Sequence, residues 1–168
     1  MTPRLPVAVL GATGVVGQAL VQRLVDHPWF ELTAVGASER STTRRYGDAL
    51  HRNMCDLRPE TRDLMVLPCT PGAIDAPIVF SALDGAVAGP IEESFALAGA
   101  LVVSNARSHR LDDDVPLLIP EVNADHLELV ERQRAARGWS GAIVTNPNCA
   151  TAVISLALAP LHRAFGLR

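Results

Sequence analysis

Cysteine and glycine occur at two places in this 168-residue sequence where their spacing indicates chemistry. Near the C-terminus, Cys149 follows Asn146-Pro147-Asn148 and directly precedes an apolar helical pattern. We expect this turn to aim the thiol at unpaired backbone N–H groups and at the positive end of the helix dipole. Such a position favours the thiolate and can hold a negative oxygen on a bound carbonyl, to which the Asn148 amide can also donate. Cys149 is therefore the candidate nucleophile.

The other two cysteines, Cys55 and Cys69, have no comparable neighbourhood. A free cysteine is commonly a small buried hydrophobic residue, and this is our prediction for both. The three cysteines lie far apart and form neither a Cys-x-x-Cys pair nor a zinc-finger arrangement with histidine. The sequence thus predicts no metal site and a reducing, cytoplasmic setting.

The second group is the glycine-rich segment Gly11-Ala12-Thr13-Gly14-Val15-Val16-Gly17, between an expected strand and an expected helix. This context predicts that a dinucleotide pyrophosphate binds at the helix N-terminus. The first glycine permits the tight turn, the second lets the backbone approach the pyrophosphate, and the third allows the helix to pack closely on the strand. The spacing is G-x-x-G-x-x-G rather than the commoner G-x-G-x-x-G, so a glycine-rich turn that binds nothing is the alternative.

The end of the second expected strand distinguishes the two nicotinamide cofactors, because an acidic residue there binds the ribose 2′-hydroxyl and repels a 2′-phosphate. Ser38 occupies the expected tip, and Arg40 and Ser41 follow it. Arginine and serine can hold a phosphate through charge-assisted hydrogen bonds. Glu39 argues against a phosphate, but one residue beyond the tip we expect it to point away. The segment therefore favours NADP over NAD.

Composition excludes several classes of function. Apolar residues make up 48% of the chain, charged residues 20%, and the net charge is −3, which argues against disorder and against nucleic-acid binding. All 15 basic residues are arginine, so a Walker-type phosphate lysine, a Schiff base and a Ser-Lys dyad are excluded within these residues. The N-terminus lacks a secretory-signal pattern, and no stretch approaches the ~20 apolar residues that span a bilayer. We expect neither a nucleic-acid nor a membrane partner.

The elements that must position these groups are short aliphatic strands alternating with helices. This pattern predicts an α/β fold, Rossmann-like and doubly wound, with a mostly parallel sheet and helices on both faces. The expected strands are residues 7–10, 32–36, 64–67, 78–82, 101–104 and 142–145, and the expected helices are residues 15–26, 88–98, 124–137 and 152–165. Asn123 is expected to cap the third helix and Gly138 to end it. Residues 40–59, with room for a short helix, and residues 111–121 are expected to be loops.

Taken together, these segments resemble the N-terminal half of the aspartate-β-semialdehyde dehydrogenases, and they are most similar to the archaeal and fungal branch. The matching segments follow the family order over almost the whole chain: residues 11–18, 37–41, 80–83, 103–106, 109–110, 115–123 and 146–151. One departure lies beside the cofactor loop. There the family has a small residue, a glycine and a basic pair, whereas this chain has Thr42-Thr43-Arg44-Arg45.

The resemblance implies an NADP-dependent phosphorylating dehydrogenase of lysine, threonine and methionine biosynthesis. The Cys149 thiolate would displace phosphate from aspartyl phosphate, and NADPH would reduce the resulting thioester to the semialdehyde. Asn148 would orient the acyl group, and Arg110 and Asn105 would bind the substrate or phosphate. From the residues alone, Arg110 is a surface arginine and Asn105 a turn residue. The implied cofactor ligands are Gly11, Thr13, Gly14, Val15, Val16 and Gly17 for the pyrophosphate, Ser38, Arg40 and Ser41 for the 2′-phosphate, and Ser81, Ala82 and Leu83 near the ribose and nicotinamide.

The family is about twice as long as this chain. The resemblance therefore implies that residues 1–150 form the NADP-binding domain, and that residues 151–168 lead into a catalytic and dimerisation domain absent from these residues. That domain carries the family's general base. His162 lies about 20 Å along the helix from Cys149, and nothing in the sequence places His109, so we assign no base. A separate C-terminal half or a homo-oligomer is the expected macromolecular partner.

Two other functions remain open. A malonyl-coenzyme A reductase uses a similar scaffold and thioester chemistry, and the sequence does not separate it from the first function. A non-catalytic NADP-binding or regulatory module is the third hypothesis. Relatives that act on N-acetylglutamyl phosphate usually have Gly before and Tyr after the cysteine, so Asn148 and Ala150 argue against that substrate.

Overall fold

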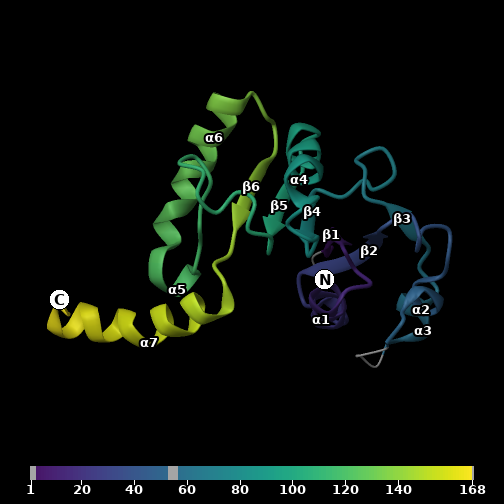
Figure 1. The fold of residues 1–168 in the computed structure, drawn as a ribbon, viewed down its shortest axis with the longest axis horizontal. Helices are drawn as coiled ribbons and strands as arrows, with labels where there is room; N and C mark the ends of the chain where they lie inside the picture. Colours follow the sequence, from purple (N-terminus) through teal and green to yellow (C-terminus); the bar gives the residue numbers. More distant parts are fainter. Residues whose placement is uncertain (1–2, 53–56, 168) are drawn as a thin grey trace.

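The computed structural model describes residues 3–52 and 57–167, and these residues form one six-stranded sheet with all neighbouring strands parallel (Figure 1). The strand order is β3-β2-β1-β4-β5-β6. The strands are β1 (Leu5–Leu10), β2 (Phe30–Ala37), β3 (Val66–Pro68), β4 (Ile78–Ser81), β5 (Leu101–Ser104) and β6 (Ala142–Thr145). The chain builds outward from β1 to β3, returns to the other side of β1, and continues to β6. The predicted doubly wound fold is confirmed, with its switch point between β1 and β4.

Helices cover both faces of the sheet, and β1 is buried between two apolar clusters. Val7 and Val9 pack into one cluster with residues of α1 (Val15–Leu24) and α2 (Tyr46–Ala49), whereas Ala8 and Leu10 pack into the other with residues of α4 (Ala88–Leu97). A strand buried on both faces must be apolar throughout, which explains the unbroken run at residues 7–10. The remaining elements are α3 (Pro59–Arg62), α5 (Pro120–Asn123), a 3₁₀ helix (Ala124–Glu128), α6 (Leu129–Arg137) and α7 (Cys149–Phe165).

The third predicted helix differs most from the structure. It begins as the 3₁₀ helix and becomes α-helical only at Leu129. The prediction that Asn123 caps it is wrong, because the Asn123 side chain accepts from the Ile119 N–H and donates to the Leu117 carbonyl instead. Asn123 thereby closes the short α5 turn. Gly138 ends α6 at φ +67° as predicted.

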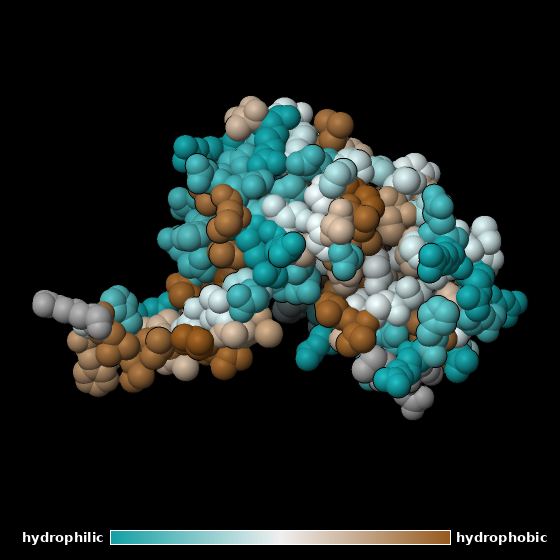
Figure 2. Space-filling model, viewed as in Figure 1, coloured by the Kyte–Doolittle hydropathy of each residue, from teal (hydrophilic) through white to brown (hydrophobic). Residues whose placement is uncertain are grey.

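Helix α7 extends away from the sheet as a long arm (Figure 1). None of its residues is buried, and hydrophobic side chains cover much of its visible surface (Figure 2). Arg163 of α7 donates to the carbonyls of Glu121 and Val122 in α5. Across the described residues, no helix combines the length and hydropathy needed to cross a bilayer.

Arg137 at the end of α6 fastens the loop before α5 to the body of the domain. Its guanidinium donates to both Asp114 carboxylate oxygens at 2.6 Å and to Asp112 at 2.8 Å, and it lies 4.9 Å above the Trp139 ring. The hydrogen bonds from Arg137 lower the pKa of Asp114. Burial raises the pKa of Asp112, but the bonds from Arg137 and His109 outweigh burial, so the net shift is also downward.

We expect Arg137→Met to lower the free energy of unfolding by about 2 kcal/mol at pH 7, because two partly buried carboxylates lose charge-assisted hydrogen bonds. Depressed folded-state pKa values stabilise the fold above the unfolded Asp pKa of about 4, and this stabilisation disappears as the pH falls through the folded-state values. Urea unfolding should therefore show a smaller difference between variant and wild type at acidic pH. Arg45→Met, which breaks an exposed pair with Asp63, is the control and should cost about 0.5 kcal/mol or less. If Arg137→Met lowered the free energy of unfolding by the same amount at neutral and acidic pH, the prediction would be contradicted.

Candidate cofactor cleft and active-site residues

A cleft of about 1010 Å³ opens where β1, β2, β3 and β4 end. The carboxyl ends of parallel strands lie at one edge of the sheet, so segments distant in sequence meet there. Of the predicted site residues, the cleft brings together Gly11, Thr13, Gly14, Val15, Val16, Ser38, Arg40, Ala82, Leu83 and Asn105. Its wall also contains Glu39, Cys69 and Asp84.

The glycine-rich turn at the centre of the cleft depends on two glycines. Gly11 adopts φ +70°, and a Cβ there would lie 2.5 Å from the Ala82 carbonyl oxygen. A Cβ on Gly17 would lie 2.1 Å from the Gly11 carbonyl oxygen. The buried Tyr46 hydroxyl supports the turn by donating to the Ala12 carbonyl at 2.8 Å. The turn therefore presents the N-terminus of α1 and its unpaired backbone N–H groups to the cleft, as pyrophosphate binding requires.

A tight turn follows β2 at the cleft edge, where the Ser41 N–H donates to the Ser38 carbonyl. Ser38 and Arg40 line the cleft and are exposed, whereas Ser41 is buried and does not line it. Glu39 also lines the cleft beside Arg40. The edge thus presents one basic and one acidic side chain.

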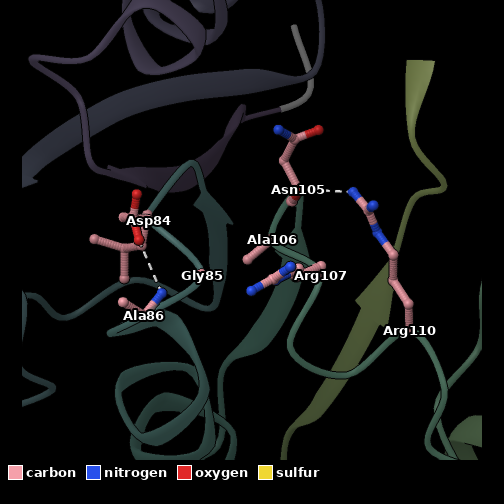
Figure 3. A pocket seen from close by; sticks show the side chains of 8 residues that line it. Asp84, Gly85, Ala86, Asn105, Ala106, Arg107 and Arg110 are labelled. Carbon is pink, nitrogen blue, oxygen red and sulfur yellow. Dashed lines mark hydrogen bonds between the residues drawn. The ribbon is translucent and has the colours of Figure 1, made fainter. Parts of the chain in front are cut away.

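A second cavity, of about 470 Å³, lies between the loop after β4 and the loop after β5 (Figure 3). It shares Leu83, Asp84 and Asn105 with the cleft, so the two spaces adjoin. Arg107 and Arg110 line it. Arg110 donates from Nη2 to the Asn105 carbonyl at 2.9 Å. Its Nε is buried without a hydrogen-bond partner among the described residues, which is uncommon for a charged donor.

Cys149 is the first residue of α7 and is exposed. Asn148 caps this helix by accepting from the Thr151 N–H at 2.9 Å through Oδ1, so its NH₂ group is the end that can donate to a ligand. Asn146 donates to Asn105 Oδ1 at 3.0 Å. The turn before Cys149 is therefore hydrogen-bonded to Asn105, one of the three residues that both cavities share, although Cys149 and Asn148 line neither cavity.

The remaining residues considered in the sequence analysis differ in their positions. Ser81 and Gly17 are buried beneath the cleft. Cys69 is half-buried in the cleft wall, where burial raises the pKa of its thiol more than a backbone hydrogen bond from Gly11 lowers it. Cys55 lies outside the described residues. His162 is near the far end of α7 and contacts the Leu167 carbonyl.

Sequence reasoning missed Arg107, Asp84 and Glu92. Arg107 lies three residues before Arg110 in a short polar segment. The local sequence does not show that both side chains reach the same cavity. Glu92 had a clearer signal, because it shares a helix face with the buried Phe95 and Ala96. An acidic residue within an apolar helical stripe is unusual and indicates a buried polar partner.

The parallel sheet and the glycine-rich turn at its switch point define a dinucleotide-binding α/β domain. Residues 6–130 match the family "Semialdehyde dehydrogenase, NAD binding domain", and the chain belongs to this family. The resemblance inferred from the sequence motifs is confirmed.

Individual relatives agree with the family assignment. The chain is 50% identical to an aspartate-semialdehyde dehydrogenase of Archaeoglobus fulgidus over 94% of this chain and 46% of that protein. It is 39% identical to a malonyl CoA reductase (NADP) of Metallosphaera sedula over 98% of this chain and 46% of that protein. The crystal structure of the Candida albicans aspartate semialdehyde dehydrogenase with NADP superimposes with a TM-score of 0.88 at 42% identity, covering 98% of this chain and 48% of that one. The chain therefore spans about half the length of the relatives it matches.

Proposed function

We propose that this chain is the cofactor-binding and nucleophile-bearing part of an NADP-dependent aspartate-semialdehyde dehydrogenase. The reaction converts L-aspartyl 4-phosphate and NADPH to L-aspartate 4-semialdehyde, phosphate and NADP. The observation that carries this proposal is the junction of two cavities: a dinucleotide-type cleft and an arginine-lined cavity share Leu83, Asp84 and Asn105. An anionic substrate in the second cavity would lie beside a cofactor in the first.

The described residues fit NADP. The backbone N–H groups of Gly14, Val15 and Val16 would bind the pyrophosphate at the start of α1. Ser38 and Arg40 would bind the 2′-phosphate at the cleft edge, and Ala82 and Leu83, which also line the cleft, would lie near the ribose and nicotinamide. The bound cofactor supplies the hydride.

The chemistry on this chain centres on the Cys149 thiolate. Its sulfur would attack the acyl carbon of the substrate, forming a C–S bond while the bond from that carbon to the phosphate oxygen breaks. The Asn148 NH₂ group would donate to the acyl oxygen as negative charge develops there. Arg110, whose Nε lacks a partner, would bind the anionic end of the substrate or the phosphate with help from Asn105.

The remaining parts of the site would come from outside these residues. Residues 1–150 form the cofactor domain in this proposal, and α7 leads to a second domain, a separate half-enzyme or another copy of the chain. The unburied apolar surface of α7 supports this, as does the half-length match to the relatives. We expect the general base to belong to that part, because His109 is 5% exposed and His162 lies near the far end of α7. A cytoplasmic enzyme acting on small molecules fits this proposal.

Malonyl-coenzyme A reduction is the second candidate, favoured by the similarity to the Metallosphaera sedula enzyme. Assays of phosphate-dependent NADP reduction with aspartate semialdehyde, and of NADPH oxidation with malonyl-coenzyme A, distinguish the two substrates. If the chain is instead a non-catalytic NADP-binding module, it binds NADPH without turnover. Robust turnover by the purified 168-residue chain would exclude that module.

Arg40→Ala tests the cofactor assignment. We expect NADPH affinity to fall at least about tenfold, because a charge-assisted pair with the 2′-phosphate is lost, while NADH affinity changes by less than about twofold. Fluorescence titration with each cofactor measures both constants. Arg45→Ala removes an arginine that does not line the cleft and should change neither constant. An equal loss for NADPH and NADH would remove the case for 2′-phosphate recognition.

A further inference from the structure

A buried carboxylate joins the ends of two neighbouring strands beneath the proposed substrate site. Glu92 of α4 is completely buried, and its Oε1 accepts from the Ser81 hydroxyl at 2.5 Å and from the Ser104 hydroxyl at 2.8 Å. These serines end β4 and β5 and are paired in the sheet register. The Ser104 hydroxyl also accepts from the Ala106 N–H at 3.1 Å. Glu92 therefore holds the start of the segment 105–110, which carries Asn105, Arg107 and Arg110.

His109 holds the other end of the same segment. Its ring is 5% exposed, and Nδ1 lies 2.9 Å from Asp112 Oδ2, which in turn accepts from Arg137. Arg110 follows directly in the chain, and its guanidinium folds back to the Asn105 carbonyl. The direction of the Arg110 side chain thus depends on where the His109 ring is fixed.

The two anchors face each other inside the protein. Glu92 Oε2 and His109 Nε2 are 3.9 Å apart, and each is buried without a hydrogen-bond partner among the described residues. Burial raises the pKa of Glu92 more than its serine bonds and the nearby His109 lower it. In the tautomer in which His109 Nδ1 donates to Asp112, Nε2 faces Glu92 Oε2 as an acceptor. The pair couples the start of the segment to its end.

We propose that Glu92 and His109 are positioning residues that hold the segment 105–110 so that Arg110 can bind an anion. The identity of that anion rests on the proposed function. That the ligand is an anion follows from the positive charge of Arg110 and does not depend on the proposed function. Among the described residues, the polar contacts of Glu92 and His109 are to Ser81, Ser104 and Asp112 and to each other, rather than to the glycine-rich turn. The pair should therefore govern the affinity for phosphate and leave most of the NADPH affinity unchanged. A residue needed only for folding would affect both ligands alike.

Inorganic phosphate and NADPH are the two probes. The 168-residue chain, labelled with ¹⁵N at arginine, would be titrated with phosphate while the Arg110 Nε–H resonance is followed, with Arg110→Lys used to assign it. Glu92→Leu should weaken phosphate binding on the order of tenfold, because small misplacements of a binding group are costly, and should change NADPH affinity by about twofold or less. His109→Phe keeps a ring of similar size without its polar atoms, and the same result is expected.

Two further variants show whether the effect of Glu92 comes from its hydrogen bonds, from its charge or from a general loss of folding. In Glu92→Gln the amide oxygen can still accept from both serines and the NH₂ group can donate to His109 Nε2, so phosphate affinity should stay within about twofold of wild type. Leu97→Ala is the control on the same helix, since the Leu97 side chain is exposed. It should leave both affinities unchanged.

The possible outcomes are distinct. If Glu92→Leu does not fold, His109→Phe decides the question. An unchanged phosphate affinity in the folded variants would overturn the inference. So would an equal loss for phosphate and NADPH, a Glu92→Gln variant as weak as Glu92→Leu, or a wild-type chain whose Arg110 resonance does not respond to phosphate. A wild-type chain that binds phosphate but not NADPH would instead contradict the proposed function.

Discussion

Gly17→Ala is expected to lower NADPH affinity at least about 100-fold and the free energy of unfolding by about 2 kcal/mol. The added Cβ would lie 2.1 Å from the Gly11 carbonyl oxygen and 2.7 Å from the Ala12 Cα. Both are backbone atoms, which cannot rotate aside as the end of a side chain can. Helix α1 must therefore move away from β1, and the N–H groups at its start lose their alignment with the pyrophosphate. Fluorescence titration and urea unfolding measure the two effects separately.

Gly14→Ala and Gly72→Ala are the matched controls. A Cβ on Gly14 would meet its nearest neighbour at 3.4 Å, and its φ of −77° suits alanine, so stability should change by about 0.5 kcal/mol or less. NADPH affinity should still fall, because the new methyl group occupies the space where the backbone approaches the pyrophosphate. A Cβ on Gly72 would have open space around it, and we expect no effect on either property. Wild-type binding by Gly17→Ala would contradict the assignment of this turn.

Cys149 is expected to react with iodoacetamide at least about tenfold faster than Cys69 near neutral pH. The Cys149 side chain is exposed at the start of α7, so the reagent can reach its sulfur. The Cys69 thiol is half-buried and its pKa is raised by burial, so less of it is ionised. We also expect Cys149 to react faster than Cys55. Mass spectrometry of the labelled peptides over time gives the three rates.

Two variants test the origin of that reactivity. Cys149→Ser should remove the fast phase of labelling entirely. Asn148→Asp keeps an oxygen to cap α7 but replaces the NH₂ donor with a negative charge beside the thiol, so labelling of Cys149 should slow. Equal labelling rates for the three cysteines would count against Cys149 as the nucleophile.

Local sequence patterns predicted most of the fold, because each pattern acts within a few neighbouring residues. The apolar run at residues 7–10 indicated a doubly buried strand, and the glycines of the following turn indicated a close approach of backbone. Gly138 ends α6 as expected, because ending a helix in this way requires only a residue that can adopt a left-handed φ. The prediction that Asn123 caps the third helix was wrong because the Asn123 side-chain oxygen accepts from the Ile119 N–H instead.

The site was predicted less completely, because its geometry depends on contacts between distant segments. The motifs identified Cys149, Arg40 and the glycine-rich turn, but not that Glu39 shares the cleft edge with Arg40. They also did not show that Ser81, a predicted cofactor ligand, turns inward to Glu92. A single side chain at a strand end can face the ligand or the core, and only the packing of α4 against β4 and β5 decides which.

The sequence by itself therefore determined the family, the doubly wound fold class and the candidate nucleophile, since these follow from motif spacing and from the alternation of strands and helices. The tertiary structure decided which polar side chains reach a cavity. It brought Asn146 to Asn105, placed Arg110 in the adjoining cavity, and buried Glu92 against two serines and His109. The physical reason is that a buried polar group must find its partners in space. Those partners come from strand ends and loops whose approach no local pattern specifies.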